Sequence, residues 1–438
     1  MLTQTRPQLG RTGSWVWAIA LGIVTALMSL ARLITTRSNA LESVLFAEDG
    51  IFPLCVAKAD ALTCLVDPYA GYFIFLPRVL AIPVAGFPIE SWALAANVTA
   101  AVSVGVLALV SFVSLVRWGL SPLWSTLIAL VPVTAPIVGF EAINVYASIY
   151  MPLMFTMTIV LITWTPDRRP WLPAIGVLIT ALTIPSAVVL LIPLAVIVWR
   201  RLLSLRDALI VGFGLVAGLI VQLVVSLTAD NPRQIAVSFD SLRGWVDNVP
   251  VALTTVWPGL SFGPAPIFGI FTTPVQTATG WLVVAVMAGV GIWLLIRPSL
   301  ARNAIGSMIL VGLAAGAIPT VIGYASNRYF VIPVLLWIAA GLVALGSHAW
   351  QRPTLVLMLT LALLVFAWWP AFGASEWRAS ATPPWKLEAN RLVETCRADP
   401  GAVVDVLFTP DWPMPHIEVT EPTTNRVPCL SLGLWREQ

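Results

Sequence analysis

Long apolar segments, separated by short polar ones, run along almost the whole chain. Their lengths match the roughly 17 to 25 residues that a helix needs to cross the hydrocarbon core of a bilayer. The pattern therefore predicts an all-α polytopic membrane protein with about eleven transmembrane helices. We expect these helices at approximately 15-36, 91-116, 122-140, 147-164, 172-184, 186-199, 207-228, 279-296, 304-323, 329-346 and 354-371. The fifth and sixth are short and divided by a turn at 183–186, so they are either tilted spans or a re-entrant pair.

Three longer polar stretches interrupt this pattern, at 37-90, 229-278 and 372-438. In the first stretch, the apolar segment 72–87 has only 16 residues and contains Arg78. This length is too short for a span, so the segment predicts a juxtamembrane helix at the membrane interface.

The last stretch combines two kinds of periodicity. A helical pattern at 385–396 is followed by alternating apolar residues at 403–408, which predicts a strand. We therefore divide the chain into a transmembrane domain, residues 1-371, and a small mixed α/β C-terminal cap, residues 372-438.

Composition excludes a soluble globular protein. Hydrophobic residues make up 58% of the chain and charged residues only 10%, whereas soluble domains average about 25% charged residues. The first apolar segment is too long for a signal peptide and predicts a retained first span. The protein is thus expected in the plasma membrane as a multi-pass protein.

Charge sets the expected orientation. With the N-terminus in the cytoplasm, all the short loops rich in arginine lie on the cytoplasmic side, as the positive-inside rule requires. The basic residues on that side are Arg6, Arg11, Arg117, Arg168, Arg169, Arg200, Arg201, Arg206, Arg297, Arg302 and Arg352. The three polar stretches and the C-terminus are then extracytoplasmic.

Several motif classes are missing from the sequence. It contains no phosphate-binding P-loop, no glycine-rich dinucleotide fingerprint and no zinc-ligand spacing. The predicted spans also carry no ionisable residue near the bilayer midplane, which argues against an ion-coupled transporter. We expect membrane lipids as surroundings and no nucleic-acid partner.

The first external stretch opens with two adjacent carboxylates, Glu48 and Asp49, followed by Gly50. A carboxyl group near apolar surroundings can act as a general base on a hydroxyl. Asp49, and less strongly Glu48, is therefore a candidate catalytic residue. The alternative is a solvated turn closed by Gly50.

The same stretch continues with a carboxylate, two aromatic rings and a cation. Asp67, Tyr69, Tyr72 and Arg78 lie within about a dozen residues and could bind a polar ligand. The alternative is that the tyrosines anchor the protein at the interface and Arg78 reaches a lipid headgroup.

Polar residues also mark the outer ends of later helices. Glu141 and Asn144 lie between the third and fourth spans, and Arg328 and Tyr329 lie before the tenth. Such residues can converge on one cavity in a helical bundle. Arg328 is the candidate for a phosphate, because guanidinium forms bidentate bonds to it. The alternative is that it anchors its helix at the headgroups.

All four cysteines fall in the stretches expected outside the cytoplasm. An oxidising compartment favours disulfides, and local pairing is the simplest of the three possible connectivities. We expect Cys55 to pair with Cys64 and Cys396 with Cys429. The alternative is four free thiols.

These motifs together resemble the GT-C glycosyltransferases of bacteria. The resemblance lies in the run Glu48-Asp49-Gly50, Asp67 to Tyr72 and Pro77-Arg78, in Glu141 to Asn144, and in the pair Arg328-Tyr329. It covers about the first 200 residues and residues 323–335.

The resemblance implies sugar transfer from a polyprenyl-phosphate donor to a glycan or glycolipid acceptor outside the cytoplasm. Asp49 or Glu48 would be the base, and Arg328 with Arg78 would hold the donor phosphate. The arginine-rich, lysine-poor composition would fit an actinobacterial enzyme that uses decaprenyl phosphate. No Asp-x-Asp motif stands in the first stretch, so no metal ligand is assigned and a divalent cation is left open. The rival classes are a lipid-linked glycan flippase or ligase and a non-catalytic membrane scaffold.

Overall fold

The computed structural model is mostly helical. It describes residues 11–36, 42, 44–45, 47–69, 71–135, 144–164, 169–202, 204–228, 274–297, 299–321, 331–347, 384–407 and 426–432. The predicted span 354-371, and almost all of the stretch 229-278, lie outside these ranges.

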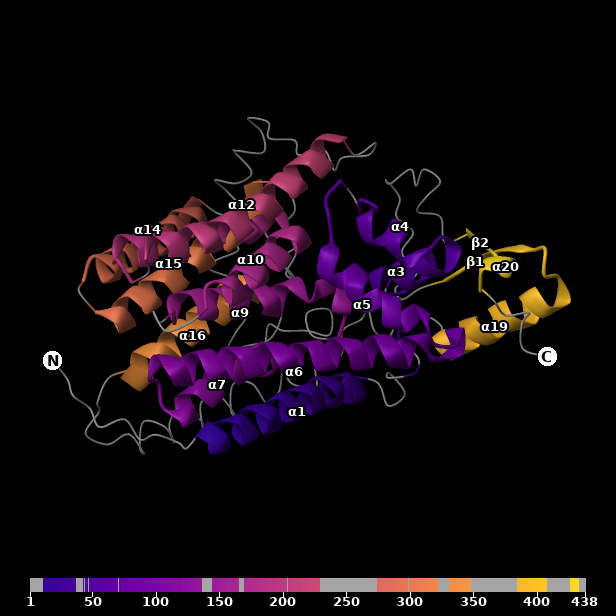
Figure 1. Ribbon diagram of the computed structural model, residues 1–438, viewed down its shortest axis with the longest axis horizontal. Helices are drawn as coiled ribbons and strands as arrows, with labels where there is room; N and C mark the ends of the chain where they lie inside the picture. Colours follow the sequence, from indigo (N-terminus) through magenta and orange to yellow (C-terminus); the bar gives the residue numbers. More distant parts are fainter. Residues whose placement is uncertain are drawn as a thin grey trace.

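Each of the first ten predicted spans overlaps at least one helix. These helices are α1 (Arg11–Thr36), α6 (Trp92–Trp118), α7 (Pro122–Thr134), α9 (Tyr150–Ile162), α10 (Trp171–Thr183), α11 (Leu191–Trp199), α12 (Leu205–Thr228), α14 (Pro274–Ile296), α15 (Leu300–Val321) and α16 (Val331–Ser347). They lie side by side along the long axis of the molecule (Figure 1).

Within the described residues, four helices are long and apolar enough to cross a membrane. They are Trp15–Ile34, Ile89–Trp118, Leu205–Thr228 and Leu300–Ile318. The remaining apolar helices have 10–17 described residues. The structure is thus that of a helical membrane protein, and the finer count of spans rests on the sequence pattern.

One predicted boundary needs correction, and the predicted turn at 183–186 is confirmed. The predicted span 122-140 ends early, because Ala135 adopts an extended conformation after α7. Between the fifth and sixth predicted spans, Ile184 is extended because it precedes Pro185, which disfavours the helical conformation. The sixth segment then begins as the 3-10 helix η3 (Pro185–Leu190) before α11.

Small residues let neighbouring helices approach closely. A Cβ on Gly105 of α6 would lie 2.5 Å from the carbonyl oxygen of Gly22 on α1, and a Cβ on Gly214 of α12 would lie 2.5 Å from that of Ala174 on α10. Membrane helices pack in this way because burial of apolar surface does not drive their association in lipid.

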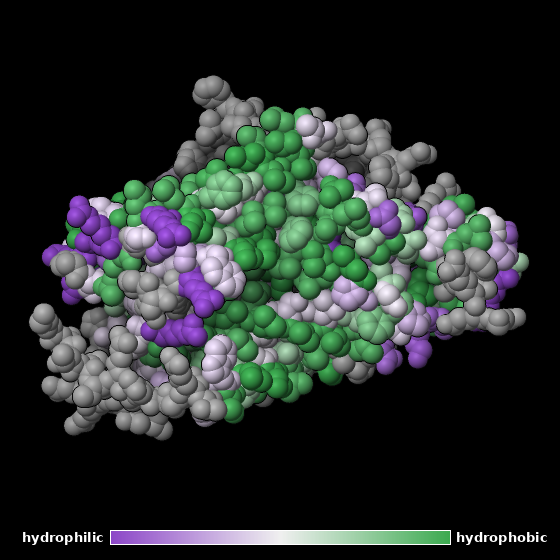
Figure 2. Space-filling view, in the orientation of Figure 1, coloured by the Kyte–Doolittle hydropathy of each residue, from purple (hydrophilic) through white to green (hydrophobic). Residues whose placement is uncertain are grey.

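The middle of the molecule is apolar at its surface. Figure 2 shows a hydrophobic band between two more polar ends. Val16, Phe213 and Leu227 expose 66%, 75% and 76% of their surface. Exposed apolar residues in this number are unfavourable in water but are suited to contact with lipid chains.

One end of the band carries arginines beside tryptophans. Arg117 lies over the ring of Trp15 at 5.9 Å, and two similar pairs are Arg200 with Trp199 at 4.5 Å and Arg297 with Trp293 at 4.7 Å. We call this the basic end. Tryptophan and arginine are typical of the boundary between lipid and water.

The opposite end, which we call the cap end, carries the C-terminal cap (Figure 1). The cap contains α19 (Trp385–Ala398), β1 (Val403–Asp405), β2 (Arg426–Pro428) and α20 (Cys429–Leu432). The helix and the first strand agree with the sequence pattern. β1 pairs with β2 in antiparallel register, with Val404 opposite Val427.

The cap shares a hydrophobic core with the first external stretch. The indole nitrogen of Trp385 donates to the carbonyl oxygen of Ile89 at 2.8 Å, in the 3-10 helix η1 (Ile89–Ser91). Trp385 also stacks on Trp92, with ring centroids 6.3 Å apart. The cap therefore docks at the start of α6.

Candidate functional site

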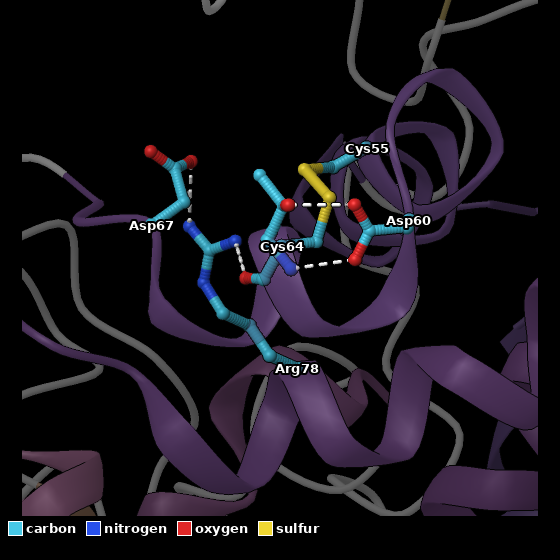
Figure 3. The surroundings of a disulfide bond; sticks show 6 residues. Cys55, Asp60, Cys64, Asp67 and Arg78 are labelled. Carbon is cyan, nitrogen blue, oxygen red and sulfur yellow. Dashed lines mark hydrogen bonds and ion pairs between the residues drawn. A yellow bond between two sulfur atoms is a disulfide. The ribbon is translucent and has the colours of Figure 1, made fainter.

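The first external stretch forms three short helices at the cap end. They are α3 (Ala47–Lys58), α4 (Ala61–Val66) and α5 (Phe75–Ala85). α5 corresponds to the predicted juxtamembrane helix at 72–87, whereas no bounds were predicted for further helices such as α3 and α4. The Cys55–Cys64 disulfide joins α3 to α4 (Figure 3).

Asp60 caps α4. Its carboxylate accepts from the hydroxyl of Thr63 at 2.6 Å and from the amide of Thr63 at 2.8 Å. The hydrogen bond from the Thr63 hydroxyl is the main cause that lowers the pKa of Asp60, and the bond from the Thr63 amide lowers it further. Asp60 is thus an ionised capping residue at the start of a helix.

Arg78 is a structural residue in this stretch (Figure 3). Its guanidinium donates to the carbonyl oxygen of Cys64 and lies 3.2 Å from the carboxylate of Asp67. Only 3% of Arg78 is exposed, so the alternative that it reaches a lipid headgroup is wrong. Burial lowers the pKa of Arg78, and Asp67 opposes that shift. Arg78 thus holds α5 to the end of α4.

The two tyrosines also pack within the stretch. Tyr69 and Tyr72 pair through their backbones, and their rings meet edge to face at 6.3 Å. Tyr69 contacts the ring of Phe52 at 5.4 Å, and the guanidinium of Arg78 lies 5.1 Å from the same ring. These residues build the local core around Phe52.

Asp49 lies in α3 and is 1% exposed. One carboxylate oxygen accepts from the amide of Tyr146 at 3.1 Å and the other from the amide of Ala147 at 2.8 Å. The Tyr146 hydroxyl donates to the carbonyl oxygen of Asp49 at 2.6 Å. The alternative of a solvated turn is therefore wrong, because Asp49 is buried within a helix. The side chain of Glu48 lies outside the described part.

The contact with Asp49 positions a second segment. Tyr146 begins the 3-10 helix η2 (Tyr146–Ser148), which leads into α9. Unpaired amides at a helix start attract a negative charge. The two amide bonds suit an ionised carboxylate, which can only accept hydrogen bonds.

Asn144 precedes this segment and connects it to α1. Its amide nitrogen donates to the carbonyl oxygen of Ser29 at 2.8 Å and contacts the Ser29 hydroxyl at 3.2 Å. Asn144 is 1% exposed. Its side-chain oxygen has no hydrogen-bond partner within the described ranges.

Arg32 is a candidate that the sequence interpretation missed. It lies one turn after Ser29 on α1, is 6% exposed, and donates to the carbonyl oxygens of Val133 at 2.9 Å and Ala135 at 3.3 Å. These two carbonyl groups lie at the C-terminal end of α7. An arginine inside an apolar membrane segment is itself a signal of a functional site, and this signal could have identified Arg32.

These buried polar residues lie near the end of α1, at the start of α3, and in or just before η2. We define the outer cluster as Ser29, Arg32, Asp49, Asn144 and Tyr146. Hydrogen bonds join Asp49 to Tyr146 and Asn144 to Ser29. Asn144 lies two residues before Tyr146 in the chain, and Arg32 lies three residues after Ser29. The outer cluster thus offers a carboxylate, a guanidinium and an amide oxygen.

Some predicted site residues cannot be added to the outer cluster. Glu141, Arg328 and Tyr329 lie outside the described residues. Asp67 and Arg78 pair with each other, as Figure 3 shows, and belong to the core of the first external stretch. Of the predicted site residues, the structure connects Asp49 and Asn144 through the short segment 144–147.

Gln222 on α12 was also missed. Its amide nitrogen donates to the carbonyl oxygens of Phe73 at 2.7 Å and Ala181 at 2.9 Å, and its oxygen accepts from the Phe73 amide at 2.9 Å. Gln222 therefore ties the segment before α5 to α10 and α12. A glutamine in an apolar segment is the sequence signal for such a contact.

Among the described residues, no group of three or more His, Cys, Asp or Glu side chains could hold a metal ion. No protein-family model and no curated protein matches the chain. The class that the structure defines is a helical membrane protein whose C-terminal cap contains a disulfide.

Proposed function

We propose that the protein transfers a sugar from a polyprenyl-phosphate donor to a glycan or glycolipid acceptor. The reaction would take place at the cap end, on the extracytoplasmic face of a GT-C-like bundle of about eleven spans. The observation that carries this proposal is the outer cluster, where the buried carboxylate of Asp49 on the short helix α3 accepts from the amides of Tyr146 and Ala147, shortly after Asn144 in the chain.

Asp49 would be the general base. The acceptor hydroxyl oxygen attacks the anomeric carbon of the donor sugar, and its proton passes to the Asp49 carboxylate. The bond between the anomeric carbon and the phosphate oxygen breaks, and the polyprenyl phosphate leaves with the electron pair. A carboxylate has about four acceptor positions, and the amides of Tyr146 and Ala147 orient two of them.

Arg32 would stabilise the leaving phosphate. A guanidinium binds phosphate through charge-assisted hydrogen bonds, and a fixed cation lowers the barrier where negative charge develops. Its contacts with Val133 and Ala135 fix its position. Arg328 stays a second candidate from the sequence, whereas Arg78 is no longer assigned to the donor.

The apolar surface supports a lipid-linked donor. The exposed apolar residues around the middle of the bundle would place the polyprenyl chain against a hydrophobic surface (Figure 2). A donor that already carries an activated sugar needs no nucleotide site, because positioning, a base and a cation suffice. Decaprenyl phosphate is the lipid carrier that we propose.

The test is sugar transfer in liposomes that contain the purified protein and decaprenyl-phosphate-linked sugars. We expect Asp49→Asn to lower turnover by about 100-fold or more, as loss of a general base does. Asp60→Asn is the matched control, because Asp60 also caps a helix in the first external stretch but is exposed. It should leave turnover near the wild-type level.

A non-catalytic role for Asp49 is the rival interpretation, because its two amide bonds would also suit a purely structural cap. Tyr146→Phe separates the two roles, since it removes the hydroxyl bond to Asp49 but keeps the carboxylate. If Asp49 is only structural, transfer in both variants will fall in proportion to their loss of thermal stability. Absence of transfer by the wild-type protein with all donors would contradict the proposal.

A further inference from the structure

We propose that Asn144 binds a hydroxyl group of the donor sugar through its side-chain oxygen and so selects which sugar is transferred. This inference rests on the proposed function. Its direct support is a buried hydrogen-bond acceptor that has no partner within the described residues.

The orientation of the Asn144 amide follows from its partner. The backbone carbonyl of Ser29 can only accept a hydrogen bond, so the atom 2.8 Å from it must be the amide nitrogen of Asn144. The side-chain oxygen is then the unpartnered atom. Since Asn144 is 1% exposed, bulk water does not hydrate this oxygen.

An acceptor left unpaired in a buried site is unfavourable, and most such groups in proteins are paired. A bound ligand with a hydrogen-bond donor would remove this penalty. A hydroxyl fits the requirement, whereas the oxygens of a phosphate or a carboxylate do not, because they only accept. The neutral amide also matches a neutral sugar.

The surroundings indicate the donor sugar in particular. Ser29, which holds Asn144, lies one helical turn before Arg32 on α1. Arg32 is the cation that we assign to the donor phosphate. Asn144, which bonds to Ser29, and Arg32, on the next turn of α1, would together be complementary to a sugar attached directly to phosphate.

Selectivity follows from the same geometry. A site built to bind a hydroxyl strongly rejects an analogue without it, because the buried acceptor is again left unpaired. We therefore expect the protein to discriminate between a sugar and its deoxy form at one particular hydroxyl.

The test is binding in nanodiscs that contain the full chain. The probes are decaprenyl phosphate alone, decaprenyl phosphate linked to glucose, mannose or arabinose, and the mono-deoxy forms of each sugar. For the wild type, removal of one particular hydroxyl should weaken binding by about tenfold. For Asn144→Ala, the same sugar and its deoxy form should bind equally, and decaprenyl phosphate alone should bind as it does to the wild type.

Two further variants separate ligand binding from a structural role. Asn144→Asp keeps an acceptor oxygen but loses the amide nitrogen that bonds to Ser29, so it should retain the preference for the hydroxyl. A structural role predicts that Asp is at least as damaging as Ala. Ser29→Ala removes the hydroxyl contact at 3.2 Å but keeps the backbone carbonyl that accepts from Asn144, so it should leave the preference unchanged.

The inference is overturned if no deoxy sugar binds more weakly than its parent to the wild type. It is also overturned if Asn144→Ala weakens the sugar-free lipid as much as the sugar-bearing one, which would indicate a buried water or a structural contact. These binding measurements need no turnover. Failure of the transfer proposal can therefore be distinguished from failure of the Asn144 proposal, because the binding preference and the transfer activity are measured separately.

Discussion

Gln222 makes three hydrogen bonds from a single buried side chain, to both backbone groups of Phe73 and to Ala181. We predict that Gln222→Leu, which keeps a similar volume, destabilises the protein by about 1–3 kcal/mol, because it leaves buried backbone groups unpaired. Thermal or denaturant unfolding in detergent measures the change.

The control for Gln222 is Leu223→Ala on the same helix, because Leu223 is 59% exposed and faces away from this contact. We expect a much smaller change for that variant. Equal destabilisation by both would show that helix α12 responds to any substitution, and that the Gln222 bonds contribute little.

At this scale, the sequence singled out Asp49 from its place beside a membrane segment, and Asn144 from its place at a helix junction. It could not show that Asp49 contacts Tyr146, because the two residues are far apart in the sequence and meet only in the folded protein. Arg32 and Gln222 carry a signal in their polarity, but the carbonyls that they meet, such as Val133 and Phe73, are set by packing.

The structure confirms both predicted cysteine pairs, and each disulfide joins two helices. Cys55 and Cys64 join α3 to α4 across a separation of 9 residues, and Cys396 and Cys429 join α19 to α20 across 33. In the chain-entropy model the shorter closure stabilises by about 3 kcal/mol and the longer by about 4 kcal/mol.

We predict that replacing Cys396 and Cys429 by serine unfolds the cap at a lower temperature, whereas replacing Cys55 and Cys64 has a smaller effect. The reason is that the cap is too small to be stable through its own core. Hydrogen exchange of α19 measures the result, and mass spectrometry of non-reduced peptides checks the pairing. Alkylation of all four cysteines without reductant would contradict it.

The long helices were predictable from the length of their apolar segments, but the short elements were not. α3 contains Pro53, and its apolar residues do not gather on one helical face, so no helical period marks it. β2 has only three residues and ends in Pro428. Its pairing with β1 comes from the fold, and a strand this short gives no periodic signal.

For the whole molecule, we predict that the basic end lies in the cytoplasm and the cap end outside it. The arginines of the basic end favour the cytoplasmic side because of the positive-inside rule. A membrane-impermeant thiol reagent should label Pro400→Cys in intact cells, and Leu205→Cys only after the membrane is opened. Reporter fusions should likewise place the N-terminus and residue 168 inside and residues 48 and 240 outside.

Labelling of Leu205→Cys, rather than Pro400→Cys, in intact cells would reverse the topology. It would also move the outer cluster to the cytoplasmic side and contradict the proposed extracytoplasmic transfer. A control without added cysteines should stay unlabelled, because the four native cysteines are paired in disulfides.

At this largest scale, composition and charge predicted the membrane class and an orientation, but not which segments cross fully. The sequence divided the cap from the rest of the chain at residue 372. In the structure the cap packs against the end of the first external stretch and the start of α6, since Trp385 donates to Ile89 and stacks on Trp92. Two indoles so far apart in sequence give no local pattern that predicts such a contact.

The contact between Trp385 and Ile89 spans 296 residues of sequence, and this affects how the protein is made. At about 5–20 residues per second, the ribosome adds that length in roughly 15 to 60 seconds. During this interval the first external stretch is already across the membrane, in the proposed topology, without its covering partner. The Cys55–Cys64 bond can form at once, whereas Cys396–Cys429 must wait for the end of synthesis. Oxidative folding would therefore follow the order of the chain, and a prematurely ended chain would expose the apolar face around Trp92 to proteases.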